Sequence, residues 1–269
     1  MMNVMVCVKA VPSTTEVKMD PVTKTIVRDG RQSVINPFDA SALEVAVRIK
    51  ERLGATVGVM SMGIPDTQRI LRDCLARGAD FGVLLSDRPF AGADTLATSY
   101  ALMRGIDKVR ARWAEQGSGD LSLVVCGKMA VDGDTAQIGP ELARQLGFAC
   151  VTSVCEVLEA TEGALRVLRE VDGGHEEVRV SLPALITVTK DVCNPRMPSI
   201  TGVRFGMQGP VDVWGAADVG ADPGRIGLTG SPTQVVRSFT PERASGSTPI
   251  EGDAHEQARA IVDIIKEMA

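Results

Sequence analysis

Histidine and aromatic residues are scarce in this sequence, and their scarcity excludes several kinds of function. The two histidines, His175 and His255, each lie among polar or charged neighbours, so imidazole base catalysis and histidine-rich metal sites have few candidates. Aromatic residues make up 3% of the chain, which leaves few platforms for stacking bases, and the net charge of −5 provides no basic footprint. The sequence therefore predicts no nucleic-acid partner.

Long apolar runs and paired cysteines are also absent. No run of about 18 apolar residues and no charged-then-apolar leader occurs, so we expect neither membrane insertion nor export, and a cytoplasmic location. The six cysteines form no C-x-x-C pair, and Cys7, Cys126 and Cys150 lie in apolar stretches. Buried, reduced thiols are therefore expected rather than a metal site or a disulfide framework.

Short apolar strands alternate with amphipathic helices through the first half of the chain. The predicted strands cover residues 3–11, 56–62, 81–86 and 121–126, and the predicted helices cover residues 39–53, 66–77, 94–113 and 140–146. This alternation predicts a Rossmann-like, doubly wound α/β fold with a mostly parallel sheet.

The second half of the chain has a different pattern of predicted elements. Shorter β-like stretches at 151–158, 165–171 and 177–180, with a turn signal at 172–174, predict an antiparallel hairpin, and a strand at 184–189 is expected to return to the sheet. Beyond about residue 209 the chain is rich in Gly, Pro, Ser and Asp until a predicted helix at 256–268. We therefore predict an α/β nucleotide-binding domain over residues 1–208, and a C-terminal arm and helix over residues 209–269 that pack on a partner.

A Gly- and Asp-rich loop, GKMAVDGDTAQIGP at 127–140, joins the fourth predicted strand to its helix. Glycine at the strand end lets the backbone approach a ligand, and the amides at the helix start, with the side chains of Thr135 and Gln137, can hold a phosphate. The loop matches neither the Walker A nor the G-x-G-x-x-G pattern. Asp132 and Asp134 would repel a phosphate, so we expect them to bond ribose hydroxyls, backbone amides or Lys128. The alternative is a turn that only caps the helix.

Two other helix starts offer polar groups. If the sheet order brings N-P-F-D at 36–39 beside the 127–140 loop, Asn36 and Asp39 would face the adenosine half of a nucleotide; otherwise the segment is a turn with Asp39 as a helix cap. The hydroxyls of Thr95 and Thr98 can reach phosphates, and ordinary capping explains that segment equally well.

Five motifs are spread over about three quarters of the chain. They are V-C-V-K near the start, N-P-F-D followed by A-L-E-x-A, C-L-A-R-G-A-D, G-K-x-A-x-D-G-D-T-A-Q, and R-E-V-D-G-G-H-E-E-V-R-V-S-L-P-A-L-I-T. Together they resemble the electron transfer flavoprotein beta subunit, and the last, at 169–187, looks like the signature pattern of that family.

The resemblance implies a Rossmann-like subunit that pairs with a larger, FAD-binding alpha subunit and holds a nucleotide of its own. The cofactor-binding positions that it implies, with the two threonines above, are Cys7, Asn36, Pro37, Phe38, Asp39, Met62, Thr95, Thr98, Gly127, Lys128, Met129, Ala130, Val131, Asp132, Gly133, Asp134, Thr135, Ala136, Gln137 and Ile138. Residues 191–200 match the family's recognition loop, which anchors an acyl-CoA dehydrogenase. The partner-binding positions are Asn194, Pro195, Arg196, Met197 and Ile200.

The family divides between conventional members, whose beta subunit holds a structural AMP, and electron-bifurcating members, whose beta subunit holds a second FAD. Gly133 and Ala136 leave room for a pyrophosphate, and the S-P-T-Q motif at 231–234 also resembles the bifurcating branch. We therefore expect FAD, with AMP as the alternative. The resemblance then implies that this FAD takes a hydride from NADH. It also implies that one electron passes to the alpha-subunit flavin and one to ferredoxin or flavodoxin. No side chain of this chain is expected to act as a catalytic acid, base or nucleophile, because the flavin carries the redox chemistry.

The sequence bears on two further classes of nucleotide-binding protein. A pyrophosphate-cleaving adenylating enzyme needs an S-G-G-x-D-S loop after the first strand, and this chain has A-V-P-S at 10–13. A non-catalytic adenine-nucleotide sensor stays open, and it would form a monomer or homodimer without an alpha subunit.

Overall fold

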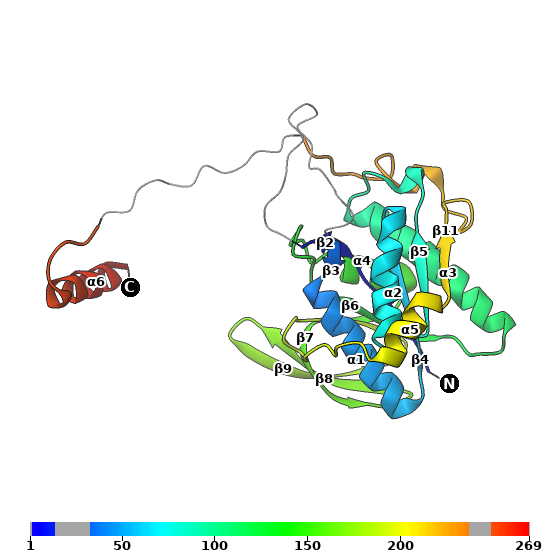
Figure 1. The fold of residues 1–269 in the computed structure, drawn as a ribbon, viewed down its shortest axis with the longest axis horizontal. Helices are drawn as coiled ribbons and strands as arrows, with labels where there is room; N and C mark the ends of the chain where they lie inside the picture. Colours follow the sequence, from blue (N-terminus) through cyan, green and yellow to red (C-terminus); the bar gives the residue numbers. More distant parts are fainter. Residues whose placement is uncertain (1, 14–32, 237–248, 269) are drawn as a thin grey trace. The chain divides into compact units, whose positions relative to one another are not determined.

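The computed structural model describes residues 2–13, 33–236 and 249–268. Its contacts divide the chain into two units, Met1–Gln234 and Val235–Ala269. The described part of the second unit contains one helix, α6 (Ala254–Met268), close to the predicted helix at 256–268 (Figure 1). Ile261, Ile264 and Ile265 share one face of α6 by their spacing, and that this helix packs on a partner stays a prediction.

One large sheet forms the centre of the first unit. Among the described residues its strands are β1 (Asn3–Cys7), β4 (Thr56–Met62), β5 (Phe81–Leu85), β6 (Leu121–Gly127), β7 (Ala149–Ala160), β8 (Ala164–Val171), β9 (Gly174–Ser181), β10 (Ala184–Val188) and β11 (Val211–Trp214). Their order is β11-β5-β4-β1-β6-β10-β7-β8-β9. The strands from β11 to β7 are parallel, and β8 and β9 continue the sheet antiparallel. The predicted mostly parallel α/β fold is confirmed.

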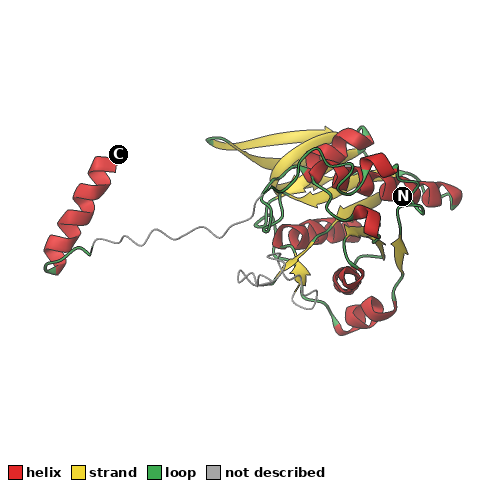
Figure 2. Ribbon diagram, turned by 90° about the horizontal axis from the view of Figure 1, so that it is seen from above, coloured by secondary structure: helices red, strands yellow, loops and turns green. Residues whose placement is uncertain are grey.

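Helices cover both faces of the sheet (Figure 2). Alternate residues of the central strand β1 serve two cores, because successive side chains point to opposite faces. Val4 and Val6 pack with α1 (Pro37–Leu53) and α2 (Gln68–Ala76). Met5 and Cys7 pack with α3 (Thr95–Glu115) and α4 (Ile138–Leu146) on the opposite face. This double burial explains why the predicted first strand reads as a continuous apolar run.

The antiparallel extension follows its predicted turn. Val171 pairs with Gly174, so Asp172 and Gly173 form a two-residue connection between β8 and β9. Gly173 has φ 84°, a left-handed conformation that glycine adopts without steric cost. β10 returns between β6 and β7, as expected for the strand predicted at 184–189.

Three features of the fold were not predicted. The first apolar run divides into β1 and a short strand β2 (Ala10–Pro12), which pairs antiparallel with β3 (Ser33–Ile35). A helix, α5 (Ile200–Gln208), follows the predicted recognition loop, and β11 joins the sheet beside β5. The predicted domain boundary at 208/209 therefore falls just before a strand of the sheet, whereas the contacts divide the chain after Gln234. Residues 237–248 of the predicted arm lie outside the described residues.

Two glycines explain why α5 was missed. Gly202 and Gly206 lower the intrinsic helix propensity of the segment. In the structure they allow α5 to lie against α2, because a Cβ at Gly206 would stand 2.5 Å from the carbonyl oxygen of Arg72, and one at Gly202 would overlap that of Ala76. Tertiary packing therefore favours a helix that local propensity does not.

Candidate functional site: a cleft at the carboxyl ends of the parallel strands

A cleft of about 970 Å³ lies at the carboxyl ends of β6, β1, β4 and β5, where open α/β sheets bind their ligands. Its volume is at the upper end of the range of about 300–1,000 Å³ for small-molecule sites. Most of the predicted cofactor-binding positions line it, and these are Cys7, Asn36, Asp39, Met62, Thr95, Thr98, Gly127, Lys128, Met129, Ala130, Gly133, Asp134, Thr135, Ala136, Gln137 and Ile138.

Four of the predicted positions do not line the cleft. Pro37 begins α1, where its fixed φ suits the first helical turn. Phe38 is buried behind the end of β6, where a Cβ on Gly127 would stand 2.6 Å from its own Cβ. Val131 and Asp132 lie on the exposed outer side of the loop.

The side chain of Asn36 holds the 127–140 loop against the start of α1. Its amide nitrogen donates to the carbonyl oxygen of Met129 at 2.9 Å, and its amide oxygen accepts from the backbone N–H of Val131 at 3.3 Å. Asn36 itself is buried. The sheet order therefore brings the N-P-F-D segment beside the loop, which was the condition for both to face one nucleotide.

Asp39 joins the ends of two strands rather than capping its own helix as the sequence suggested. Its carboxylate accepts from the backbone N–H of Lys9, after β1, at 2.8 Å and from that of Gly127, at the end of β6, at 3.1 Å. Burial raises the pKa of Asp39 to about 7, and these two backbone hydrogen bonds oppose the rise. The residue is thus built into the floor of the cleft.

The charged groups of the loop are paired differently from the expectation. Asp132 forms an ion pair with Lys9 at 2.6 Å, and Lys128 forms one with Glu170 on β8 at 3.3 Å. The partner of Asp132 is therefore not Lys128. Lys9 follows β1, and the sequence contained no signal that this strand end and residue 132 meet.

The loop has strained backbone where it faces the cleft. Asp134 and Ala136 have φ of 51° and 55°, a region that non-glycine residues rarely adopt. The amides of Gly133 and Asp134 both donate to the carbonyl oxygen of Ala130, and α4 begins shortly afterwards at Ile138. The turn amides of Gly133 and Asp134 are therefore engaged within the loop, and the amides at the start of α4 are the groups that can hold an anion here.

The start of α3 forms the facing wall. Asp94 caps this helix by accepting from the backbone N–H of Ala97 at 3.1 Å, which is the ordinary capping expected for this segment, and a phosphate contact of Thr95 and Thr98 stays a prediction. The hydroxyl of Thr95 lies 3.0 Å from the side-chain oxygen of Gln137, so the starts of α3 and α4 meet across the cleft.

The S-P-T-Q motif is attached to this wall. Asp94 also accepts from the hydroxyl of Thr233 at 2.9 Å, and its own N–H donates to the hydroxyl of Ser231 at 2.8 Å. Burial would raise the pKa of Asp94, but the hydrogen bonds from Ala97 and Thr233 outweigh burial and hold that pKa below its ordinary value. The motif therefore lies at the cleft, although the sequence placed it in an arm.

Sequence reasoning missed the part of the lining that follows β4 and β5. These residues are Gly63, Ile64, Pro65, Ser86, Asp87, Arg88, Phe90, Ala91, Gly92 and Ala93, and the other missed positions are Val8, Lys9, Asp94, Leu102, Cys126 and Gly139. The rule that ligands lie beyond the carboxyl ends of parallel strands would have found most of them, because both strands were predicted.

The cysteines differ in exposure. Cys7, Cys74 and Cys126 are buried and free, as expected, but Cys150 is exposed. Cys150 precedes the buried Val151 on β7, so its side chain points to the opposite face of the strand. Within the described residues, no cluster of three or more His, Cys, Asp and Glu side chains is arranged to hold a metal ion.

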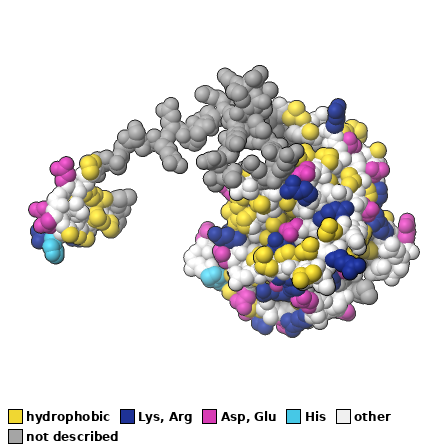
Figure 3. Space-filling model, in the orientation of Figure 1, with side chains coloured by type: hydrophobic (Ala, Val, Ile, Leu, Met, Phe, Trp, Pro, Cys, Tyr) yellow, Lys and Arg dark blue, Asp and Glu magenta, His cyan; other side chains and the backbone are white. Residues whose placement is uncertain are grey.

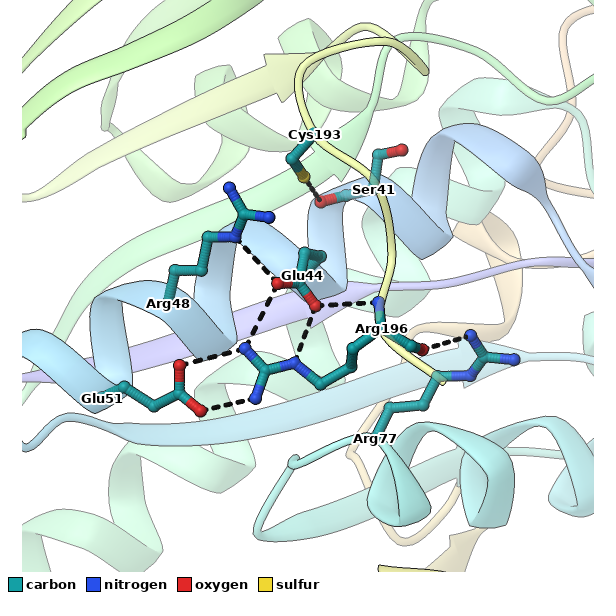
Figure 4. Close-up of polar contacts among 7 residues, drawn as sticks. All are labelled: Ser41, Glu44, Arg48, Glu51, Arg77, Cys193 and Arg196. Atoms are coloured by element: carbon teal, nitrogen blue, oxygen red, sulfur yellow. Dashed lines mark hydrogen bonds and ion pairs between the residues drawn. The ribbon is translucent and has the colours of Figure 1, made fainter. Parts of the chain in front are cut away.

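A second candidate site is the segment that was predicted to bind a partner (Figure 4). Arg196 is turned inward and donates to Glu44 of α1 at 2.8 Å through Nε, and to Glu51 at 3.0 Å through Nη2. The backbone N–H of Arg196 also donates to Glu44, and its carbonyl oxygen accepts from Arg77. Arg196 therefore anchors the segment within this chain.

The neighbouring apolar side chains point outward. Met197 is 83% exposed and Ile200 is 92% exposed, and Val203 and Met207 on α5 continue the apolar surface. On the face of the molecule that carries α1, α2 and α5, hydrophobic side chains lie among Lys, Arg, Asp and Glu (Figure 3). Of the predicted partner-binding residues, Asn194 and Pro195 are also exposed.

The helices of the described residues include none that is both long and apolar enough to cross a membrane. A family model described as "Electron transfer flavoprotein domain" matches residues 23–219. The chain is 43% identical over 268 residues to the caffeyl-CoA reductase-Etf complex subunit CarD of Acetobacterium woodii, which covers 99% of this chain and 98% of that relative.

Two further relatives match over similar lengths. The chain is 41% identical over 266 residues to the electron transfer flavoprotein subunit beta of Clostridium acetobutylicum, with 99% of this chain and 98% of the relative covered. It is 37% identical over 267 residues to the protein FixA of Bradyrhizobium diazoefficiens, with 98% of this chain and 91% of the relative covered.

Proposed function

The chain belongs to the electron transfer flavoprotein family, among its beta subunits, and from this premise we propose that its cleft holds an FAD. In this proposal the chain pairs with an alpha subunit that carries a second flavin. An FAD bound here would supply the redox chemistry, namely hydride transfer from NADH and onward transfer of single electrons. The chain's own residues bind and orient that cofactor.

The extent of the cleft is the observation that carries the choice of FAD over AMP. Its lining comes from the ends of four adjacent strands, β6, β1, β4 and β5. Neighbouring strands lie about 4.8 Å apart, so three spacings span about 14 Å across the sheet. AMP would fit on the side of the 127–140 loop and leave the β4 and β5 side open, whereas a dinucleotide fills both.

The polar groups fit such a ligand. Asn36 and Asp39 fix the loop where an adenosine would lie, while the starts of α3 and α4 suit phosphates. Cys7, Cys126 and Met62 supply apolar surface along the floor. Within the proposal none of these side chains transfers a proton, and their work is binding, orientation and exclusion of water.

The partners follow from the same proposal. We place an acyl-CoA dehydrogenase at the exposed Met197 and Ile200, and ferredoxin or flavodoxin as the acceptor of the second electron. The relative from A. woodii is named as a subunit of a caffeyl-CoA reductase-Etf complex, which supports a partner that acts on a CoA thioester. An adenine-nucleotide sensor would need no partner, and the exposed apolar side chains of Met197 and Ile200 disfavour that alternative.

Cofactor identity and stoichiometry test the proposal. The native complex is purified, denatured, and its released nucleotides are separated and counted. We expect two FAD per heterodimer and a flavin-bearing second chain. One FAD and one AMP would overturn the assignment of FAD to this chain, and a chain that purifies without a flavoprotein partner would overturn the subunit assignment.

A matched pair of variants ties the count to this cleft. Thr135→Arg fills the phosphate side of the cleft and should remove one nucleotide per heterodimer while the other stays. Thr201→Arg places the same side chain on the exposed surface of α5, outside the cleft, and should keep both. Loss of both nucleotides in Thr135→Arg would indicate misfolding, and retention of both would show that the loop is only a helix cap.

A further inference from the structure

Three basic side chains line the described part of the cleft, and only one is left without a partner there. Lys9 is paired with Asp132, and Lys128 is paired with Glu170. The guanidinium of Arg88 forms no hydrogen bond and no ion pair with any residue that the structure describes. The side chain of Arg88 is exposed at the cleft. Other arginines nearby have internal partners, such as Arg225, which lies 3.9 Å above the ring of Tyr100.

The backbone that carries Arg88 is firmly held. Asp87 accepts from the N–H of Arg88 at 2.8 Å and from the N–H of Ala216 at 3.0 Å. Phe90, two residues further on, is buried, and the carbonyl oxygen of Ala91 accepts from Leu228 at 3.1 Å. The turn is thus fixed by contacts that do not involve the guanidinium, so this charged group has no structural task in the turn.

The position of Arg88 matches one part of the proposed ligand. It follows β5, three strands away from Gly127 at the end of β6, and it precedes the start of α3 at Thr95 by a few residues. Both oxygens of Asp87 are engaged by backbone amides, and Asp94 is engaged by Ala97 and Thr233. Neither carboxylate forms an ion pair with the guanidinium of Arg88.

We propose that Arg88 binds the second phosphate of a nucleoside diphosphate, the group that FAD and ADP contain and AMP lacks. This inference rests on the proposed nucleotide site and adds the residue that distinguishes a diphosphate from a monophosphate. A guanidinium binds a phosphate through two parallel N–H donors, and an ammonium cannot copy that geometry. Arg88 is accordingly a binding residue, and no bond is made or broken at it.

The test compares AMP and ADP as probes on the complete complex after its nucleotide has been removed from this cleft. The wild type should bind ADP more tightly than AMP. Loss of charge-assisted hydrogen bonds to one phosphate typically weakens binding by about 10- to 100-fold. Arg88→Gln should therefore lose about that factor for ADP and for FAD, and should bind AMP as the wild type does.

Two further variants serve as controls. Arg88→Lys keeps the charge and should recover part of the affinity for ADP. Arg144→Gln removes an exposed arginine of α4 that does not line the cleft, and should change neither affinity. Without bound nucleotide, the melting temperature of Arg88→Gln should equal that of the wild type, because no hydrogen bond or ion pair of the guanidinium within the described chain is lost.

Each outcome has a distinct meaning. An equal loss for AMP and ADP would place Arg88 at the first phosphate, and no loss for either would make it a solvated surface arginine; both results overturn the inference. If the native complex contains AMP in this cleft but Arg88→Gln loses affinity for ADP alone, the assignment of FAD fails while the inference about Arg88 stands.

Discussion

Replacing Arg196 by alanine should destabilise the protein mainly through the lost ion pair with Glu44, and much less through the lost ion pair with Glu51. The guanidinium is 33% exposed and contacts Glu44, which is 5% exposed, and Glu51, which is 56% exposed. Once the side chain of Arg196 is removed, Glu44 would keep its bond to Arg48, at 2.8 Å, and the bond from the backbone N–H of residue 196, at 3.1 Å, but no guanidinium from this segment. Glu51 would be hydrated by solvent.

The structure sets the size of the effect. Breaking a buried ion pair costs about 3–5 kcal/mol, and the partial exposure of Arg196 reduces this to about 2–3 kcal/mol for the pair with Glu44. An exposed pair such as that with Glu51 contributes about 0.2–1 kcal/mol. Arg196→Ala should therefore lower the free energy of unfolding by about 3 kcal/mol, which lowers the melting temperature by about 6–12 °C in a chain of this size.

Double-mutant cycles separate the two pairs. Arg196→Ala, Glu44→Ala, Glu51→Ala and the two double variants are compared by urea unfolding, so that the coupling energy of each pair is obtained. The coupling with Glu44 should exceed the coupling with Glu51 by at least a factor of two. If the two are equal, or if Glu51 dominates, the reasoning from burial is refuted.

The pair with Glu44 also has a defined pH dependence. Burial alone would raise the pKa of Glu44, but the hydrogen bonds from Arg196 and Arg48 outweigh burial and hold this pKa below its ordinary value. A carboxylate with a depressed pKa in the folded state contributes stability above its unfolded pKa, and this contribution is lost as the pH falls through the folded pKa. The difference between the wild type and Arg196→Ala should therefore be constant near neutral pH and shrink in acid.

Two other changes follow from close contacts and exposure. Gly127→Ala should lower the free energy of unfolding by about 2 kcal/mol or more and weaken nucleotide binding, because its Cβ would overlap the carboxylate of Asp39. Gly133→Ala, whose Cβ meets open space in the same loop, should leave the free energy of unfolding of the nucleotide-free protein nearly unchanged. Equal melting temperatures for the two nucleotide-free variants would contradict this account. The double variant Met197→Asp with Ile200→Asp should weaken binding to a purified acyl-CoA dehydrogenase by at least about 10-fold without changing flavin content, measured by surface plasmon resonance. Val213→Asp, at an exposed apolar position on β11, is its control, and an equal loss in both would indicate a non-specific effect.

Local pattern predicted the parallel part of the fold well. β4 has the predicted bounds, and the predicted strands and helices around it differ from the structure by a few residues at most, because each reads as a strand buried on both faces or as an amphipathic helix. α5 and β11 were not predicted, for two different reasons. The helix contains glycines that only its packing on α2 explains, and β11 has four residues, too few for a periodic signal.

The site was predicted where a single segment carries the information. The 127–140 loop reads as a ligand loop from its own sequence, and it lines the cleft. The ion pair between Lys9 and Asp132 and the capture of Arg196 by Glu44 join residues 123 and 152 positions apart in the chain. Such pairs depend on how helices and strands are placed relative to one another. No short motif in a single sequence predicts that placement.

The two outermost strands of the sheet have a consequence for self-association. An edge strand presents unpaired backbone groups that can recruit a copy of the same chain, and charged side chains on the edge oppose this. β9 carries His175, Glu176, Glu177 and Arg179 on its exposed positions, and Asp212 of β11 is paired with Arg112 at 2.8 Å. Both ends of the sheet, as the described residues form it, therefore resist edge-to-edge aggregation with further copies of this chain.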